Sequence, residues 1–154
     1  MGVHFDIAPE FEMLIDTTAL RKNIQLITLH LNIPQETELT IAFVNDAAIQ
    51  QLNLEFRGID SPTDVLSFPV NEVNPEDDSV YIGDVIISMD TAKKQSEQQS
   101  ISPLDEIYLL IIHGVLHLLG FDHDSLENKE NMWAKQSELL QLLHCPANPD
   151  RYSI

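Results

Sequence analysis

Residues 107–123 constrain this chain more than any other stretch, because they combine a long apolar run with three histidines. The run from Ile107 to Phe121 is apolar on nearly every side, which predicts a helix buried at the centre of the protein. His113 and His117 are four residues apart, so on a helix they lie on one face, one turn above the other. Such a pair belongs either to the core or to a metal site.

Gly120 and His123 extend the pair into a metal-binding pattern. Glycine adopts left-handed backbone angles at little cost, so Gly120 can end the helix and turn the chain back. That turn can bring His123 to the side of the helix that carries His113 and His117. Three neutral imidazoles converging on one point predict a zinc site with an open fourth position, as catalytic zinc requires. We expect one zinc ion per chain, although the same ligands could hold other transition metals.

The spacing H-x3-H-x2-G-x2-H equals that of the zinc-binding stretch of the metzincin proteases, H-E-x-x-H-x-x-G-x-x-H. Those proteases carry a general-base glutamate directly after the first histidine, and here that position is Gly114. The ligand spacing is therefore kept while the protease base is missing, which argues against a peptidase or amidase. His4, His30 and His144 stand in no ligand spacing and are expected not to bind the metal.

The rest of the chain predicts an α+β fold, in which a small mixed β-sheet packs with about five helices around one core. The expected strands are a weak one within 3–15, then 38–44, 64–68 and 80–87, the third of them stopped by Pro69. Residues 71–79 read as a loop and residues 147–154 as a loose tail. Because no repeat or linker divides the sequence, residues 1–154 are expected to form a single metal-dependent hydrolase domain.

Each expected helix begins at a residue whose side chain can cap it. The candidate caps are Thr17 or Thr18, Asn45 or Asp46, Ser88, Ser102, and Asp124. The helices are expected to end before Pro34, at Gly58, near Gln99, at Leu119 and near Leu143.

The charge balance limits the partners of this protein. Its 25 acidic and 8 basic residues give a formal net charge of −17, which opposes non-specific binding to nucleic acid and to anionic membranes. We therefore expect neither DNA nor a membrane as a partner. The single cysteine, Cys145, forms no internal disulfide and indicates a reducing compartment. The first ten residues lack the pattern of a signal peptide, so a cytoplasmic location is expected.

Four further charged residues allow two interpretations each. Arg57 ends an expected helix, where it would complement the helix dipole, or it holds a phosphate and its developing charge. Spacing alone favours the dipole. Asp122 could orient the ring of a metal ligand or simply shape a loop, whereas Asp124 reads more as a helix cap. Asp64, at the start of a short strand, reads more as a turn or cap residue than as a catalyst.

Three blocks of the sequence resemble the YbeY family, the metal-dependent endoribonucleases also called rRNA maturation factors. The blocks are LNLEFRGIDSPTDVLSFP at 52–69, GDVIIS at 83–88 and HGVLHLLGFDH at 113–123. They follow one another in the order of the family, and they cover the middle and the C-terminal part of the chain.

The resemblance implies that His113, His117 and His123 are zinc ligands and that, with Arg57, they form the catalytic site. It thereby favours the phosphate-holding role of Arg57. It also implies cleavage of single-stranded RNA in ribosomal RNA processing and ribosome quality control, with the ribosome or ribosomal proteins as partners. Zinc in such a site would lower the pKa of a water to about 7 or polarise a phosphoryl oxygen. The nucleophile is then either that water or the RNA 2′-hydroxyl.

Two other functions compete with this interpretation. The first is a ribosome-associated assembly or binding factor whose metal is structural, and the second is a metallo-peptidase-like hydrolase. The acidity also has to be explained, because a charge of −17 is unsuited to gripping many phosphates at once. Either the RNA contacts are confined to a groove around the metal and Arg57, or a basic ribosomal partner delivers the RNA.

Overall fold

The structure is a computed structural model that describes residues 2–149; Met1 and residues 150–154, which the expected domain and tail include, lie outside the described residues. One mixed sheet of four strands has the order β1-β2-β4-β3. The strands are β1 (Gly2–Ile7), β2 (Thr37–Val44), β3 (Val65–Val73) and β4 (Val80–Ser88). Strands β1, β2 and β4 are parallel, and β3 runs antiparallel to β4 along an edge of the sheet.

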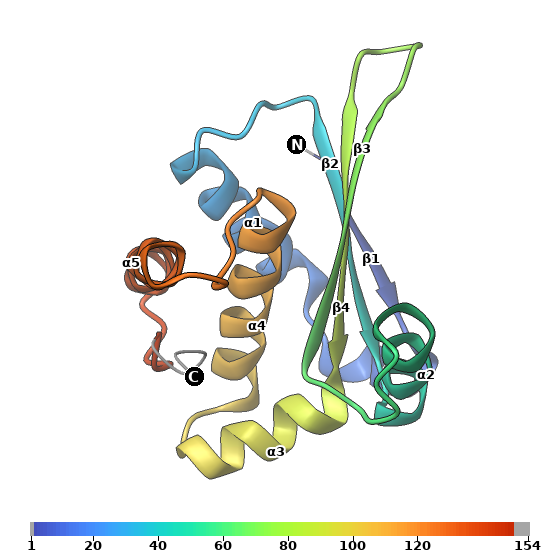
Figure 1. Ribbon diagram of the computed structural model, residues 1–154, viewed down its shortest axis with the longest axis vertical. Helices are drawn as coiled ribbons and strands as arrows, with labels where there is room; N and C mark the ends of the chain where they lie inside the picture. Colours follow the sequence, from blue (N-terminus) through green and yellow to red (C-terminus); the bar gives the residue numbers. More distant parts are fainter. Residues whose placement is uncertain (1, 150–154) are drawn as a thin grey trace.

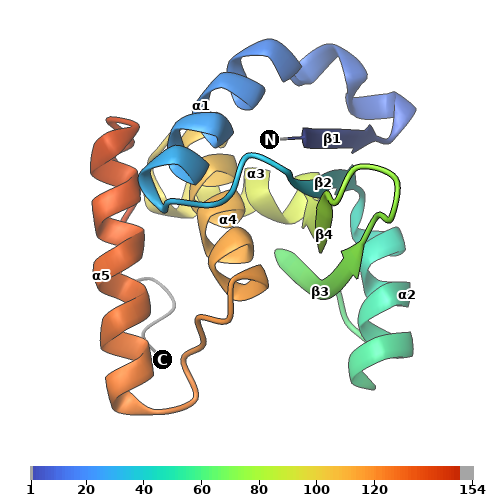
Figure 2. The ribbon, with the colours of Figure 1, turned by 90° about the horizontal axis from the view of Figure 1, so that it is seen from above.

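The helices of the described residues cover both faces of this sheet. They are the short 3-10 helix η1 (Pro9–Leu14) and the α-helices α1 (Thr17–His30), α2 (Asp46–Arg57), α3 (Met89–Gln99), α4 (Pro103–Leu118) and α5 (Leu126–Leu142). Figures 1 and 2 show α1, α4 and α5 on one side of the sheet and α2 on the other. The α+β class and the small mixed sheet predicted from the sequence are confirmed.

Helix α4 is buried at the centre, as its apolar sequence predicted. One side of it packs on the sheet, where Leu110, Ile111 and Val115 join the cluster that contains Ile41 and Val85. Its opposite side meets α5 through a second cluster that includes Leu109, Ile112, Leu116, Met132 and Leu139. Because both sides are held, the end of α4 that carries His113 and His117 has a fixed position relative to β3 and α5.

Gly114 allows α4 to approach the sheet closely. A Cβ atom at this position would lie 2.5 Å from Cγ1 of Val85, so any larger residue would push the helix away. Ser67 of β3 uses the same approach, because its hydroxyl donates to the Gly114 carbonyl over 3.0 Å. At the position that holds the base in metzincins, this chain therefore has a glycine that packs directly against the sheet.

The third strand is longer than the sequence indicated. We expected it to stop at Pro69, but β3 continues through that residue to Val73, so this prediction was wrong. A proline is tolerated because β3 is an edge strand and its register shifts between Pro69 and Glu72. Opposite Pro69, Gly83 allows a close approach of the two strands, since a Cβ there would lie 2.2 Å from the carbonyl oxygen of Phe68.

Two helix caps differ from those expected. Asp16, rather than Thr17 or Thr18, caps α1 by accepting from the Ala19 N–H over 3.1 Å. Ser125, rather than Asp124, caps α5 by accepting from the Asn128 N–H. In both cases a neighbouring residue with an extended backbone provides the acceptor, which sequence alone could not distinguish. The caps at Asn45, Ser88 and Ser102 are confirmed.

The described part of the C-terminal tail is packed rather than loose. Ala147 is buried against the cluster between α4 and α5, and the Pro149 carbonyl accepts from Gln136 of α5. Among the described residues, no helix by itself has the length and apolarity needed to cross a membrane, although the bent pair α3 and α4 reaches both thresholds together.

Candidate metal centre

The structure brings His113, His117 and His123 together at the C-terminal end of α4. The Nε2 atoms of His113 and His117 are 3.1 Å apart, and one ring nitrogen from each of the three histidines lies within 4.8 Å of the other two. Within residues 2–149, this is the one group of three or more histidine, cysteine or acidic side chains close enough to share a metal ion. The convergence expected from the spacing is therefore present, and ligation itself stays a prediction.

Gly120 produces the turn that returns His123 to the helix. It has a φ of 94°, and its N–H donates to the His117 carbonyl over 3.1 Å, while the Phe121 N–H donates to the Leu116 carbonyl over 3.0 Å. These two bonds and a left-handed residue define a Schellman motif, the commonest way to end a helix on glycine. The sequence predicted this role of Gly120.

His113 is held from behind by α5. Its side chain is buried, and its Nδ1 atom lies 2.5 Å from Oε1 of Gln136, which is also buried. Burial lowers the pKa of His113 to about 4, although the Gln136 hydrogen bond opposes the shift. Burial also lowers the pKa of half-buried His117, with a further contribution from His123. Both rings are therefore neutral at pH 7, the form that binds metals.

Sequence reasoning missed Gln136. Its signal is a polar residue within an apolar helical stripe, since Met132, Gln136 and Leu139 follow one another on the buried side of α5. A buried side-chain amide needs partners for both of its ends, so such a position points to a specific polar contact.

The donor set fits a zinc ion. Two nitrogens that each lie ~2.0–2.1 Å from a tetrahedral zinc are about 3.3 Å apart, close to the 3.1 Å between His113 and His117. Imidazole is a common ligand of zinc and also of copper, nickel and iron, so the donors select a transition metal rather than calcium or magnesium.

The histidines open into a cavity of about 510 Å³. Arg57 comes to its wall from the end of α2, and Asp64 and Ser67 come from the start of β3. The structure thus places the candidate arginine at the same cavity as the histidines, although it stands 56 positions before His113 in the sequence. Arg57 is exposed, so its guanidinium is accessible to a ligand that enters from solvent.

The other acids of this region shape the backbone. Asp64 accepts from the Val65 N–H over 2.8 Å, which agrees with the turn role expected for it. Asp122 accepts from the N–H of His123 over 2.8 Å, which supports its loop-shaping role over the orienting of a ligand ring. Asp124, which does not cap α5, accepts from the side chain of Asn128.

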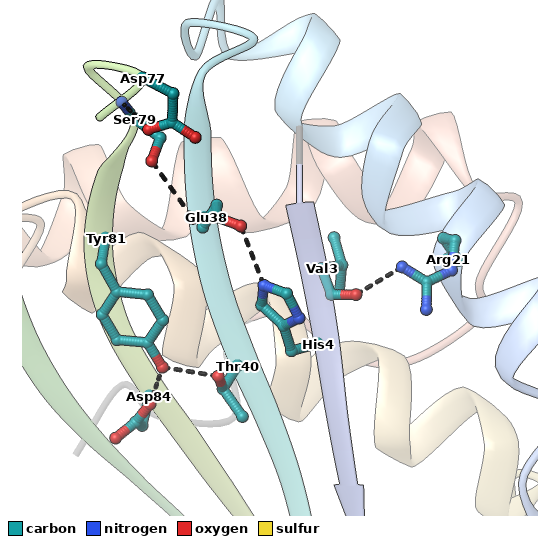
Figure 3. A network of polar contacts seen from close by, with 9 residues as sticks. All are labelled: Val3, His4, Arg21, Glu38, Thr40, Asp77, Ser79, Tyr81 and Asp84. Atoms are coloured by element: carbon teal, nitrogen blue, oxygen red, sulfur yellow. Dashed lines mark hydrogen bonds and ion pairs between the residues drawn. The ribbon is translucent and has the colours of Figure 1, made fainter. Parts of the chain in front are cut away.

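The remaining histidines lie away from the cluster. His4, on the sheet face turned away from α4, contacts Glu38 over 3.1 Å (Figure 3). On the same face the hydroxyl group of Tyr81 contacts Thr40 and Asp84 (Figure 3). His30 contacts Glu138 over 2.9 Å. His144 adopts a φ of 54° just after α5, which is a backbone role. None of the three belongs to the group of histidines described above.

Comparison with known proteins gives one family. The family model described as Endoribonuclease YbeY matches residues 10–144. An endoribonuclease YbeY of Persephonella marina is 41% identical over 123 residues, which cover 79% of this chain and 80% of the relative. That of Lysinibacillus sphaericus is 43% identical over 117 residues, covering 71% of this chain and 74% of the relative. A Thermotoga maritima protein solved in solution has a similar fold, with a TM-score of 0.60, 25% identity and coverage of 92% and 91% of the two chains.

Proposed function

The chain belongs to the YbeY endoribonuclease family, and on this premise we propose that it is a zinc-dependent enzyme that cleaves single-stranded RNA during ribosomal RNA processing. As a member of the family it is a hydrolase that cleaves phosphodiester bonds of RNA.

One observation carries the proposal: three histidine nitrogens within 4.8 Å of one another open into a cavity whose wall also presents Arg57. His113, His117 and His123 would hold one zinc ion. When bound, zinc supplies Lewis acidity, either to a phosphoryl oxygen or to a water molecule. Because only three side chains would bind it, the zinc would stay accessible to substrate or water, as in catalytic zinc sites.

The chain's own contribution to catalysis is positioning and charge. The guanidinium of Arg57 can pair with phosphate oxygens through two parallel N–H groups, and it stabilises the additional negative charge of the transition state. The core and Gln136 hold the His113 ring in one orientation, so the site needs little rearrangement when substrate enters.

The shape of the site supports the proposed preference for single strands. The cavity is a recess beside the edge strand β3. A phosphodiester of a flexible strand can bend into such a recess with its bases turned aside, whereas the backbone of a duplex is held on a stiff helix.

The acidic surface supports a ribosomal setting. With a net charge of −17, the protein is complementary to basic ribosomal proteins, which could place ribosomal RNA at the cavity. We therefore propose the ribosome or its proteins as partners and the cytoplasm as the location, with roles in ribosomal RNA maturation and ribosome quality control. We also propose that residues 1–154 act as a single hydrolase domain.

The test is cleavage by metal-stripped protein before and after addition of one equivalent of zinc. The substrates are a single-stranded RNA, the same RNA annealed to its complement, and a single-stranded DNA of the same sequence. We expect zinc to restore cleavage of the single-stranded RNA alone. Stoichiometric zinc binding without cleavage of any RNA would contradict the proposal and favour an assembly factor with a structural metal.

A matched pair of ribosomal substrates tests the setting. Precursor ribosomal RNA should be cut faster within ribosomal particles than as naked RNA, because the basic proteins attract the acidic enzyme. Equal rates for both forms, or faster cutting of naked RNA, would contradict the proposed ribosomal partner.

A further inference from the structure

We infer that Gln136 and the backbone carbonyl of Pro149 set the tautomer of His113, so that its Nε2 atom is ready for the metal before the metal arrives. This inference rests on the proposed metal site and adds two positioning groups to it. Both lie outside the three histidines and Arg57.

Gln136 is placed between the metal centre and the C-terminal tail. It is fully buried on the inner side of α5. Its Oε1 atom lies 2.5 Å from Nδ1 of His113, and its Nε2 atom donates to the Pro149 carbonyl over 2.7 Å. Each end of the amide therefore has one partner of its own.

The direction of this chain of contacts is fixed by the Pro149 carbonyl. A backbone carbonyl oxygen only accepts hydrogen bonds, so the NH2 group of Gln136 must face it. The amide oxygen then faces His113, and because that oxygen also only accepts, Nδ1 of His113 must carry the proton. The lone pair of the neutral ring is consequently on Nε2, the atom that lies 3.1 Å from Nε2 of His117.

Packing holds the C-terminal tail in the position that lets Pro149 contact Gln136. Ala147 is 5% exposed and packs with Leu139, Leu140 and Met132 in the cluster between α4 and α5. The turn before it is closed by the Cys145 N–H, which donates to the Leu140 carbonyl over 2.9 Å. Pro149 is thus brought back to Gln136, thirteen residues earlier in the sequence.

Pro149 lies outside residues 10–144, which the family model matches. A carboxylate is a frequent partner of a metal-binding histidine, but it could not donate to Pro149. The neutral amide can donate to the Pro149 carbonyl and accept from His113 at the same time, so it can connect the tail to the ring.

The tautomer can be measured directly. Ring-nitrogen NMR of the metal-free protein at pH 7.5 distinguishes a protonated Nδ1 from a protonated Nε2, and His113→Ala identifies the signal. We expect His113 to carry its proton on Nδ1 in the wild-type protein and to populate the Nε2–H form in Gln136→Met. Gln141→Met, the same change at an exposed position of α5, is the control and should leave the His113 signal unchanged.

Zinc affinity provides the second readout, measured by competition with a chelator. Loss of a hydrogen-bond partner behind a metal ligand typically weakens metal binding by about 10–100-fold, which we expect for Gln136→Met. Gln136→Glu keeps an acceptor for Nδ1 and should bind zinc at least as tightly as the wild-type protein. Ala147→Asp, which should displace the tail in the full chain, should shift the tautomer toward Nε2–H and weaken zinc binding. Ala134→Asp, at an exposed site of α5, should do neither.

Two results would overturn the inference. The first is a wild-type His113 with its proton on Nε2, and the second is unchanged zinc affinity in a folded Gln136→Met protein. If Gln136→Met does not fold, Ala147→Asp decides, and a wild-type tautomer with wild-type zinc affinity there would remove Pro149 from the mechanism. Failure of the proposed function looks different, because zinc binding without RNA cleavage leaves the His113 tautomer as predicted.

Discussion

Burial changes the chemistry of His113 and His117 before any metal is present. It lowers the pKa of His113 to about 4 and also lowers that of His117. Both rings are therefore neutral at pH 7, and they would bind the proposed metal without first losing a proton. The same shift makes the metal-free protein sensitive to acid.

The acid sensitivity has a defined pH window. Between the unfolded pKa of ~6.5 and the folded pKa of about 4, the unfolded chain binds a proton that folded His113 does not. Stability is therefore complete above about pH 6.5 and is lost as pH falls toward 4, by an expected 2–3 kcal/mol, roughly 1.4 kcal/mol per pH unit. The measurement is urea unfolding of metal-free protein at several pH values, compared with His113→Gln. That variant should lose less stability over the window, and parallel curves for the two proteins would show that His113 is not the group responsible.

Arg57 is the residue that separates catalysis from a structural role. If it meets the phosphate, Arg57→Ala should keep the fold and the zinc but lose about 10²–10³ in cleavage rate, or roughly 3–4 kcal/mol. Arg57→Lys should restore little, because an ammonium lacks the planar pair of donors. Thermal midpoint and single-stranded RNA cleavage are measured side by side for the three proteins. A lowered midpoint with normal cleavage would show that Arg57 complements the helix dipole and does not hold the phosphate.

At the residue scale, the sequence predicted the histidine cluster, because local spacing determines it. His113, His117, Gly120 and His123 lie within one helix end and its turn, so their geometry follows from a few backbone angles. Gln136 reaches His113 only through the packing of α5 on α4, which no local pattern encodes. Arg57 was placed by resemblance rather than by spacing, since its position at the cavity depends on α2 lying across the sheet.

At the scale of elements, the site depends on how α4 ends. The Schellman motif at Gly120 reverses the chain within one turn and so determines where His123 lies. Helix starts were harder to predict than helix ends, because several adjacent polar residues could serve as the cap. The strand through Pro69 was missed because the proline rule depends on whether a strand is at the edge of a sheet, which is a property of the tertiary fold.

Substitution of two glycines with similar backbones tests the role of this helix end. Gly120 and Gly58 have φ values of 94° and 71°, and a Cβ at either position meets no atom within 4 Å. Alanine should therefore cost about 1 kcal/mol of stability at both, from backbone strain alone. Gly120→Ala should also weaken zinc binding, whereas Gly58→Ala should not, because Gly58 is not in the loop that carries His123. Thermal unfolding and chelator competition measure the two effects, and equal zinc affinity in both variants would show that the Gly120 turn does not position a ligand.

At the scale of the whole molecule, the acidic surface limits how RNA can bind. A net charge of −17 leaves few places where a phosphate is attracted, and Arg57 supplies a basic side chain at the cavity wall. The protein should therefore engage RNA through one or two phosphates at the cavity, with the remaining guidance supplied by a basic partner.

The salt dependence of cleavage tests this limit. Each phosphate contact to a single strand contributes a slope of about −0.7 in a plot of log affinity against log salt. We expect kcat/KM for a single-stranded RNA to fall with a slope between about −0.7 and −1.4 when the protein acts alone, as one or two phosphate contacts predict. A slope of about −4 or steeper would mean that many phosphates contact basic side chains, which would contradict binding through one or two phosphates.

The central claim is that His113, His117 and His123 hold a zinc ion on which RNA cleavage depends. Its most direct test is zinc analysis of the purified protein and of the variants His113→Ala, His117→Ala and His123→Ala, each assayed in parallel on single-stranded RNA. His30→Ala is the control, since His30 contacts Glu138 and lies outside the group. We predict one zinc per chain with cleavage in the wild-type protein and in the control, and loss of both in each of the three variants. Full zinc content and full cleavage in any of the three would contradict the claim for that residue, and loss of zinc in the control would show that the metal lies elsewhere.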